Sequence, residues 1–382
     1  MNFGGLLGER FRRTGSVNYL DQAVTAVTAA VDATPDDHHI RAPRLHNLST
    51  WLYRRFEATG SRGDLDQAIS LSRAAVDATP HDDPGYAMSL NNLGGFLTRW
   101  SLQTAPTYDD DDDNVHQAIH ALSAALDLMS IDDPVRASNL YNLGNALGLQ
   151  FDQTGSPDDL NHQLSTYIKG WDCHPAPASV RIKSAMAAAR ILSSQQAWEQ
   201  SNRLLRDAVL LFPSISPRYL DRTDAQTLLA EFAGLGPLAA ATALNAGKTP
   251  EEALQLLEHG RGVIAGLLMD MRSDISHLQL KHPTLAKQFQ LLRDELDAPA
   301  NLARTLATEK ASPKEQQVQR RRKAEREFSS VIEAVRAQPE FANFLQPPAT
   351  EDLTAEASRG PIIAINISSL RCDALVVQRD AV

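Results

Sequence analysis

One stretch of sixteen residues occurs twice in this chain, and that repetition limits the fold more than any other feature. Residues 20–35 read LDQAVTAVTAAVDATP, and residues 65–80 read LDQAISLSRAAVDATP. The two copies lie 45 residues apart, and the same offset relates Phe11 to Phe56 and Gly15 to Gly60. Internal repeats with periods of about 20 to 50 residues are typical of solenoids and propellers, so we treat the chain first as a repeat protein.

Two further copies follow once an insertion is allowed for. The sequence QAI at 67–69 recurs at 117–119, and the five additional residues of this unit coincide with the acidic run at 109–113. Phe56 and Gly60 then recur as Phe151 and Gly155. A second repeated motif lies between these copies. It reads LNNLG at 90–94, LYNLG at 140–144 and, more loosely, LHNLS at 45–49. Each unit therefore contains two segments.

Both segments of a unit are predicted to be α-helical. In residues 65–76 the apolar positions recur mostly at three, four and seven-residue steps, which places them on one face of a helix. Ser61 or Asp64 is expected to cap its start, and Pro80 ends it because proline lacks a backbone donor. Such short helices cannot bury an apolar face alone, so the units must stack. The predicted fold class is mainly α, an α-α superhelix.

Four short sequence motifs resemble those of a known family. They are LNNLG at 90–94, RRFxxTG at 54–60, DLDQAI at 64–69 and AVDATP at 75–80. Together they resemble the tetratricopeptide (TPR) arrays that precede a caspase-like CHAT domain in fungal and bacterial proteins. The period exceeds the 34 residues of the plain TPR unit, so we expect an extended variant. Other two-helix arrays of about 40 to 47 residues are the structural alternative.

The sequence changes character near its C-terminal end. Residues 360–367 read GPIIAINI, a short apolar run rich in β-branched residues, and RCDALVV follows at 371–377. We predict two strands joined as a β-hairpin. This hairpin resembles the opening of a CHAT domain. The resemblance implies an incomplete α/β domain, related to a cysteine protease whose catalytic His and Cys lie on later strands.

These patterns predict three regions. Residues 1–296 form the TPR-like array, with clear repeats over 1–171 and degenerate repeats over 178–296. Residues 297–358 form a helical linker, and residues 359–382 form the N-terminal fragment of a CHAT-like domain. Residues 2–4 fall two periods before 92–94, so the chain begins inside a helix of a unit and we expect further repeats upstream.

Composition argues against several classes of partner and location. The net charge is −10, whereas nucleic acids and anionic membranes attract proteins with excess Lys and Arg, so neither is an expected partner. No apolar run is long enough to span a membrane, and no secretory signal is present at the start, so a cytoplasmic or nuclear location is expected. We interpret the basic run at 320–323 as a solvated helix face, with a nuclear signal as the alternative.

No catalytic, cofactor-binding or metal-binding residue is predicted. His259 and Arg261 have no Cys or Ser partner nearby in sequence, so we interpret them as packing or surface groups. Cys173 and Cys372 are too few for a disulfide or zinc framework, and Cys372 lies within the hairpin rather than at a strand end. The acidic run at 109–113 lacks the spacing of a calcium loop. We therefore predict that the chain is not an enzyme.

Two functional interpretations follow. In the first, the array is a protein-interaction scaffold, the sensor part of a TPR-CHAT protein, whose groove holds a protein or peptide ligand without a cofactor. Candidate contacts in this groove are Asn47, Asn92, Arg99 and Asn142, although each Asn is equally well explained by a hydrogen bond to a neighbouring turn. In the second, the chain is the regulatory half of a caspase-like cysteine protease whose catalytic residues lie beyond it.

Overall fold

The computed structural model describes most of the chain, as two compact units that divide at residue 191. The described residues are 7, 11, 16–103, 111–215, 230–269, 275–297, 313–342, 344–345, 354–355, 357–379 and 381–382, and among these the side chains of 111–113, 263–269, 297, 313–322, 325 and 359 are not described. The predictions made for residues 2–4 and 109–110, and for the parts of the linker at 298–312, 343, 346–353 and 356, lie outside the described residues.

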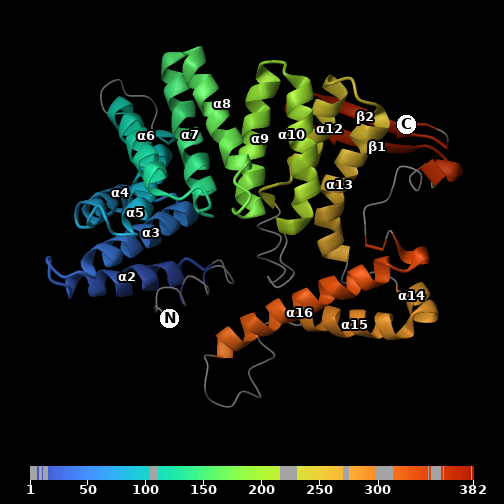
Figure 1. The fold of residues 1–382 in the computed structure, drawn as a ribbon, viewed down its shortest axis with the longest axis horizontal. Helices are drawn as coiled ribbons and strands as arrows, with labels where there is room; N and C mark the ends of the chain where they lie inside the picture. Colours follow the sequence, from blue (N-terminus) through green and yellow to red (C-terminus); the bar gives the residue numbers. More distant parts are fainter. Residues whose placement is uncertain are drawn as a thin grey trace. The chain divides into compact units, whose positions relative to one another are not determined.

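The first unit is a succession of helices in which each helix packs on the next (Figure 1). This arrangement confirms the predicted α-α superhelix. The last helix, α9, continues across the boundary between the two units. In chain order the described helices are α2 (Asn18–Asp32), α3 (Arg41–Thr59), α4 (Arg62–Asp77), α5 (Tyr86–Ser101), α6 (Asp111–Leu128), α7 (Arg136–Thr154), α8 (Pro157–Trp171) and α9 (Ala178–Ser194).

The helices of the first unit form two rows. The most extensive contacts are made within the pairs α3–α4, α5–α6 and α7–α8. We call α3, α5, α7 and α9 the inner row, and α2, α4, α6 and α8 the outer row. Helix α5 also contacts α3 and α7, whereas the described outer-row helices contact one another less. The more closely spaced row lies on the inside of a curved stack, so the inner row lines the concave side.

Two equivalent glycines make the turns between the paired helices. Gly60 and Gly155 adopt left-handed backbone conformations, with φ of 74° and 63°, and each N–H donates to a phenylalanine carbonyl four residues earlier at 2.7 Å. Glycine is favoured at this position because it has no Cβ. The side-chain capping that the sequence predicted for the start of α4 is not formed. Ser61 lies at the N-cap position without a side-chain capping bond, and Asp64 pairs with Arg55 instead.

The repeated apolar positions fill the core between the helices of the first unit. Leu20 and Leu65, which are equivalent in the two clearest copies, are fully buried in the same hydrophobic cluster. Gly94 and Gly144 lie where the paired helices approach most closely, since an added Cβ at either position would lie 2.4 Å from a side-chain carbon of the partner helix. The glycine of the repeated LxNLG motif therefore has a packing role.

The second unit begins with α10, η1, α12 and α13, and α12 packs against both α10 and α13. Gly236 and Gly260 allow α12 and α13 to cross almost backbone to backbone. The described elements of the second unit after α9 are α10 (Trp198–Leu211), η1 (Phe212–Ile215), α12 (Leu235–Asn245), α13 (Pro250–Met269), α14 (Ser276–Lys281), α15 (Pro283–Asp297), α16 (Pro313–Arg336), η3 (Pro339–Phe341), η4 (Ala357–Arg359), β1 (Ile362–Ile367) and β2 (Cys372–Val377).

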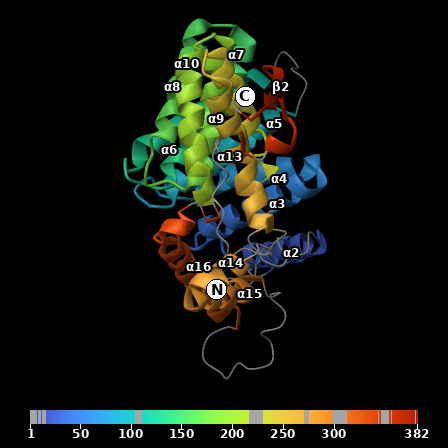
Figure 2. The ribbon, with the colours of Figure 1, turned by 90° about the vertical axis from the view of Figure 1, so that its right-hand side faces the viewer.

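Helices α14, α15 and α16 lie side by side (Figures 1 and 2). Phe289 of α15 and Phe328 of α16 are fully buried, and their ring centroids are 4.9 Å apart. Ile332 and Val335 extend this apolar contact along α16. The predicted linker is thus helical over Pro313–Arg336, and this helix packs along α15. Within the basic run, Lys323 is exposed and pairs with Glu327 at 3.7 Å.

The predicted hairpin is confirmed as an antiparallel pair, with Ile362 opposite Val377 and Ile367 opposite Cys372. One face of the hairpin is turned inward, and Leu375 and Val377 are buried there. The other face is apolar but exposed. Its most exposed residues are Ile363 (61%), Ile365 (57%) and Ile367 (70%).

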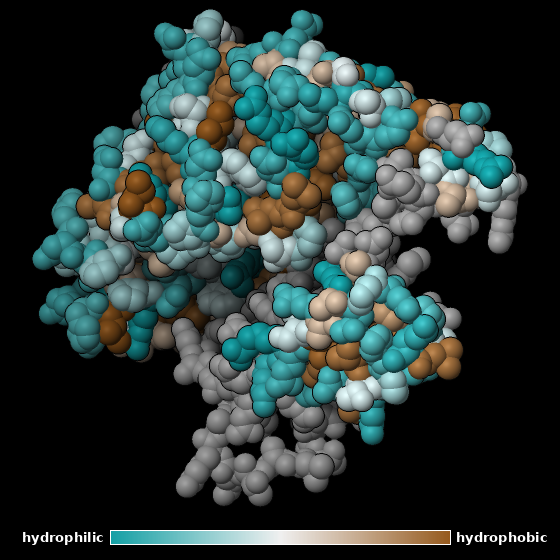
Figure 3. Space-filling model, turned by 45° about the vertical axis from the view of Figure 1, so that its right-hand side comes forward, coloured by the Kyte–Doolittle hydropathy of each residue, from teal (hydrophilic) through white to brown (hydrophobic). Residues whose placement is uncertain are grey.

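The rest of the described surface is mostly polar. On the face drawn in Figure 3, hydrophilic residues predominate and hydrophobic residues form small separate groups. Among the described helices, none combines the length and apolar character that crossing a lipid bilayer requires.

Candidate protein-interaction surface

Three of the predicted contact residues occupy one repeated position on the inner row. Asn47, Asn92 and Asn142 lie on α3, α5 and α7 at the third residue of the repeated LxNLG word, and each is half-buried. The structure therefore brings the three amides onto successive helices of the concave side. That they line a shared groove and contact a partner stays a prediction.

The asparagines also link neighbouring inner-row helices. Asn142 Nδ2 donates to Asn91 Oδ1 at 3.3 Å, and Asn92 Nδ2 donates to Thr50 Oγ1 at 3.3 Å. Asn92 Nδ2 also lies 3.4 Å from His46 Nε2. Burial lowers the pKa of His46, which favours its neutral form. Asn92 and Asn142 each use the Nδ2 group of the amide to bond to the preceding unit. The partner of each is therefore a neighbouring helix rather than the turn that was the alternative expectation from the sequence.

Arg99 lies two turns further along α5, over an aromatic cluster. Its guanidinium carbon is 5.8 Å from the centre of the Phe56 ring, and its side chain is exposed. Tyr53 stacks on Phe96 beneath it, with ring centroids 4.5 Å apart. Burial, together with the nearby Glu57 carboxylate, raises the pKa of Tyr53 to about 12, while Arg99 acts in the opposite direction. Tyr53 is therefore a neutral phenol at physiological pH.

Side-chain hydrogen bonds at one repeat position, which we call rungs, connect the inner row to carboxylates of the outer row. Arg55 Nη2 donates to Asp64 Oδ1 at 2.6 Å, and its Nη1 reaches Asp21 Oδ1 at 3.0 Å. One unit later, Trp100 takes the place of Arg55, and its Nε1 donates to Asp66 at 2.9 Å. Two units later, Gln150 Nε2 donates to Asp159 Oδ1 at 3.0 Å. The same position therefore binds an outer-row carboxylate through three different donors.

Three arginines at one repeat position cap outer-row helices, and the sequence predictions missed them. Arg41 Nη1 donates to the carbonyls of Val31 and Thr34, at the end of α2. Arg136 makes the same pair of bonds to Leu126 and Met129, at 2.7 and 3.1 Å. Arg181 Nε donates to the carbonyl of Trp171 at the end of α8, at 2.9 Å. Cationic donors satisfy the free carbonyls of a helix C-terminus.

The spacing of these arginines was available in the sequence. Arg41 and Arg136 are 95 residues apart, which is the offset between Phe56 and Phe151, and Arg181 follows 45 residues after Arg136. The repeat therefore persists through α8 and α9, where sequence identity has already decayed. A search for arginine at the repeat period would have identified all three.

The other residues that could have carried chemistry, namely His259, Arg261 and the two cysteines, make contacts typical of packing or surface groups. Arg261 pairs with Glu258 at 2.9 Å and also donates to the carbonyl of Ile365 in β1. Burial lowers the pKa of His259. Cys372 is exposed on β2, and burial raises the pKa of the Cys173 thiol, which disfavours a reactive thiolate. Within the described residues, no group of three His, Cys, Asp or Glu side chains could hold a metal ion.

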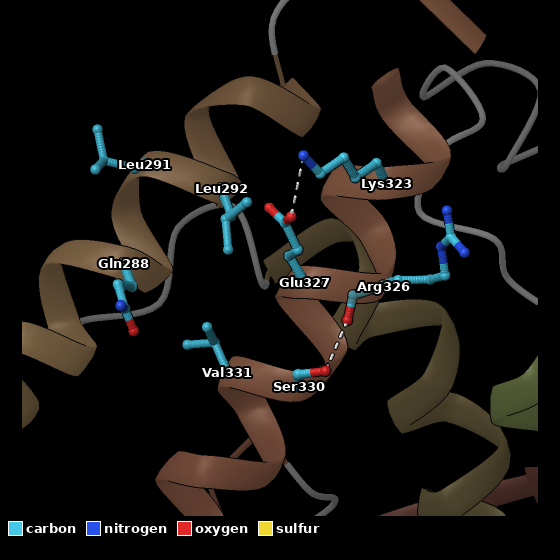
Figure 4. Close-up of a pocket in the computed structure, with 8 residues that line it drawn as sticks. All are labelled: Gln288, Leu291, Leu292, Lys323, Arg326, Glu327, Ser330 and Val331. Carbon is cyan, nitrogen blue, oxygen red and sulfur yellow. Dashed lines mark hydrogen bonds and ion pairs between the residues drawn. The ribbon is translucent and has the colours of Figure 1, made fainter. Parts of the chain in front are cut away.

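A shallow cavity of about 750 Å³ lies between α15 and α16 (Figure 4). Leu292 and Val331 contribute its apolar wall, and the Lys323–Glu327 ion pair lies beside it. The Ser330 hydroxyl donates to the Arg326 carbonyl at 3.1 Å. The lining thus combines apolar side chains with polar groups that bond within α16.

Comparison with known families identifies the repeat. The tetratricopeptide repeat family matches residues 44–84, which begin in α3 and continue through α4. No curated protein matches the chain at a significant level. The chain therefore contains a TPR repeat within a larger succession of stacked helices, and its inner row corresponds to the first helix of each TPR-like pair.

Proposed function

We propose that the first unit is a protein-interaction scaffold that binds an extended segment of a partner protein along the inner row. The observation that supports this most directly is the repeated polar stripe on the concave side. Asn47, Asn92 and Asn142 occupy one position on three successive helices, and the bonds that Asn92 and Asn142 make to the preceding unit use only the Nδ2 side of each amide. Repeat arrays commonly use such extended concave surfaces for binding.

Selection of peptide ligands from a random twelve-residue library tests this function. A selected peptide should bind the intact chain and lose at least tenfold in affinity to the Asn92→Arg variant, because the added bulk fills the inner surface. The matched control is Gln67→Arg, which adds a similar side chain on the exposed face of α4 in the outer row. Ligands that bind both variants equally would contradict an inner-row site.

We further propose that this scaffold is the sensor part of a TPR-CHAT protein. The hairpin supports this context because its outer face is apolar and exposed, as in a strand pair that needs further elements to cover it. Asn366, on the inward face, is fully buried and neither of its amide atoms has a hydrogen-bond partner among the described residues. A buried amide without partners is unfavourable, and additional sheet elements would supply them.

The genomic sequence that follows the codon for Val382 tests this context. A His-Gly pair and a Cys embedded in further predicted strands would support a CHAT domain and the alternative role as the regulatory half of a cysteine protease. A downstream sequence without strands or such residues would contradict both roles and leave the scaffold alone.

The chain itself is proposed to lack enzymatic activity. Cys372 lies in β2 with Asp373 next to it, and Asp373 is held by Arg371 at 2.7 Å rather than by a histidine. A thiol nucleophile requires a nearby base to remove its proton. Incubation of the purified chain with a peptide substrate library should give no turnover. Turnover that disappears in a Cys372→Ala variant would overturn this proposal.

A further inference from the structure

We propose that the second unit binds a neutral sugar ring in a shallow cavity between the start of α10 and the end of α12. These two helices pack side by side (Figure 1). The cavity has a volume of about 390 Å³, within the range of about 300 to 1,000 Å³ that is usual for small-molecule sites. The site belongs to the second unit alone, and it does not depend on the scaffold function proposed for the first.

Trp198 supplies a flat apolar surface in the lining of this cavity. It is the first residue of α10, and its side chain is half-buried. Its indole N–H makes no hydrogen bond to another described residue. An indole combines an apolar face with one polar donor. A pyranose ring has the matching arrangement, because its faces carry C–H groups and its edge carries hydroxyls.

Three primary amides line the same cavity. Gln196 and Gln200 are exposed, and their side chains make no hydrogen bond to another described residue. Asn245 is the last residue of α12, and its Oδ1 accepts from Arg371 Nη1 at 2.9 Å, which leaves Nδ2 as its available group. A primary amide offers donors and an acceptor side by side. Neighbouring hydroxyls of a sugar also donate and accept, so they suit such amides.

The backbone at Gln196 is unusual for a glutamine. Its φ is 59°, in the left-handed region, and it closes the end of α9. Its N–H donates to the Ser193 carbonyl at 3.1 Å, and the N–H of Ala197 donates to the Leu192 carbonyl at 2.8 Å. Glycine suits this position best because it has no Cβ. Glutamine therefore places a hydrogen-bonding side chain beside Trp198 at an energetic cost, as residues of binding sites often do.

The charge of the lining favours a neutral ligand. Glu199 is the one charged residue that lines the cavity, and its carboxylate pairs with Lys248 at 3.0 Å. Because the two charges offset each other, the site has no cation left to pair with a phosphate or a carboxylate. A nucleoside is neutral too, but flipped bases are commonly held between two flat surfaces. Trp198 is the one aromatic side chain that lines this cavity among the described residues.

Ligand-observed saturation-transfer NMR and tryptophan fluorescence test the site on the full chain. The ligands are the methyl glycosides of glucose, galactose, mannose and N-acetylglucosamine, with adenosine and inorganic phosphate for comparison. We expect at least one glycoside to bind with a Kd of about 1 mM, as is usual for so small a ligand. Trp198→Leu keeps an apolar side chain but removes the ring, and it should weaken binding at least about fivefold. Gln200→Ala should weaken it severalfold.

The matched control is Gln195→Ala, which removes an exposed glutamine outside the cavity lining and should leave binding unchanged. Circular dichroism checks that each variant is folded, and Gln200→Ala decides the matter if Trp198→Leu is not. Trp198→Phe keeps a ring and should retain binding while the fluorescence change disappears. A fluorescence change that persists in this variant would come from another of the four tryptophans and would contradict the site.

Two further results would overturn the proposal. One is that no glycoside gives a saturation-transfer signal at about 10 mM, or that the signal is equal in Gln195→Ala, Trp198→Leu and Gln200→Ala. The other is that adenosine or phosphate binds in a manner that requires Trp198 while no glycoside binds.

Discussion

Arg55 and Asp64 face each other across the Gly60 turn, with Arg55 Nη2 2.6 Å from Asp64 Oδ1. The Asp64 side chain is 8% exposed and that of Arg55 is 24% exposed, so this pair is largely shielded from water. It joins an inner-row helix to its outer-row partner. Since the equivalent rungs at Trp100 and Gln150 use uncharged donors, the pair at Arg55 is the ionic member of a repeated set.

Removal of Arg55 should destabilise the first unit. An Arg55→Met variant leaves the Asp64 carboxylate poorly exposed and without its partner, and we expect a loss of about 1 to 3 kcal/mol in the free energy of unfolding. Urea denaturation followed by circular dichroism measures it. Arg73→Met, at an exposed position of α4, should change stability by less than about 0.5 kcal/mol. Equal effects of the two substitutions would show that the rung contributes nothing.

Two glycines of the inner row should respond oppositely to alanine. At Gly144 an added methyl group would lie 2.4 Å from the Tyr167 ring, which is buried and donates from its hydroxyl to Asn145 at 2.7 Å, so the ring cannot move freely. We expect Gly144→Ala to cost about 1 to 3 kcal/mol. Gly95→Ala meets only the Asn142 amide at 3.4 Å and should be neutral or stabilise by up to about 1 kcal/mol. Thermal unfolding of both variants makes the comparison.

The arginine caps predict that α8 and α9 are as firmly linked as α6 and α7. Arg136→Met and Arg181→Met each leave helix C-terminal carbonyls without a cationic donor, and each should cost about 1 to 2 kcal/mol. Faster amide hydrogen exchange at the end of α6 or α8 would locate the effect. Arg190→Met, an exposed change on α9, provides the comparison. No change in α8 on loss of Arg181 would contradict a shared capping role.

Because the pKa of His46 is lowered in the folded chain, we expect the stability of the fold to decrease in mild acid. Burial lowers the pKa of His46 in the folded chain from its usual value of 6.5, so the unfolded chain binds a proton at a higher pH than the folded chain does. The contribution of His46 is therefore present above pH 6.5 and lost as the pH falls through the lowered folded pKa. Amide exchange in α3 should accelerate between pH 7.5 and 5.5 after correction for intrinsic rates. A His46→Gln variant should show a smaller change.

The helices, their pairing and the terminal hairpin could be predicted from the sequence because their signals are local or periodic. The QAI and LxNLG motifs alternate every 45 to 50 residues and so identified each pair of helices. The β-branched run at 362–367 identified the first strand. The TPR repeat itself is confirmed over residues 44–84. Asn47, Asn92 and Asn142 lie on successive inner-row helices because they occupy one repeat position, and their role as contacts stays a prediction.

The bonds between helices of neighbouring units were harder to predict. Arg181 reaches a carbonyl ten residues earlier, and only its spacing of 45 residues from Arg136, not the composition of α9, distinguishes it from a solvated arginine. The packing of α16 was hidden for a related reason. Its first half is strongly polar, which suggested a linker, while Phe328, Ile332 and Val335 in its second half are buried against α15.

The three kinds of rung give the stack an uneven sensitivity to its medium. Dissolved ions weaken the attraction between a guanidinium and two carboxylates far more than they weaken a bond from an indole or an amide. Asp64 is only 8% exposed and is partly protected from this effect, whereas Asp21, the second partner of Arg55, is 53% exposed. Added salt should therefore weaken the link from α3 back to α2 before the link from α3 to α4, and leave the joints at Trp100 and Gln150 almost unchanged.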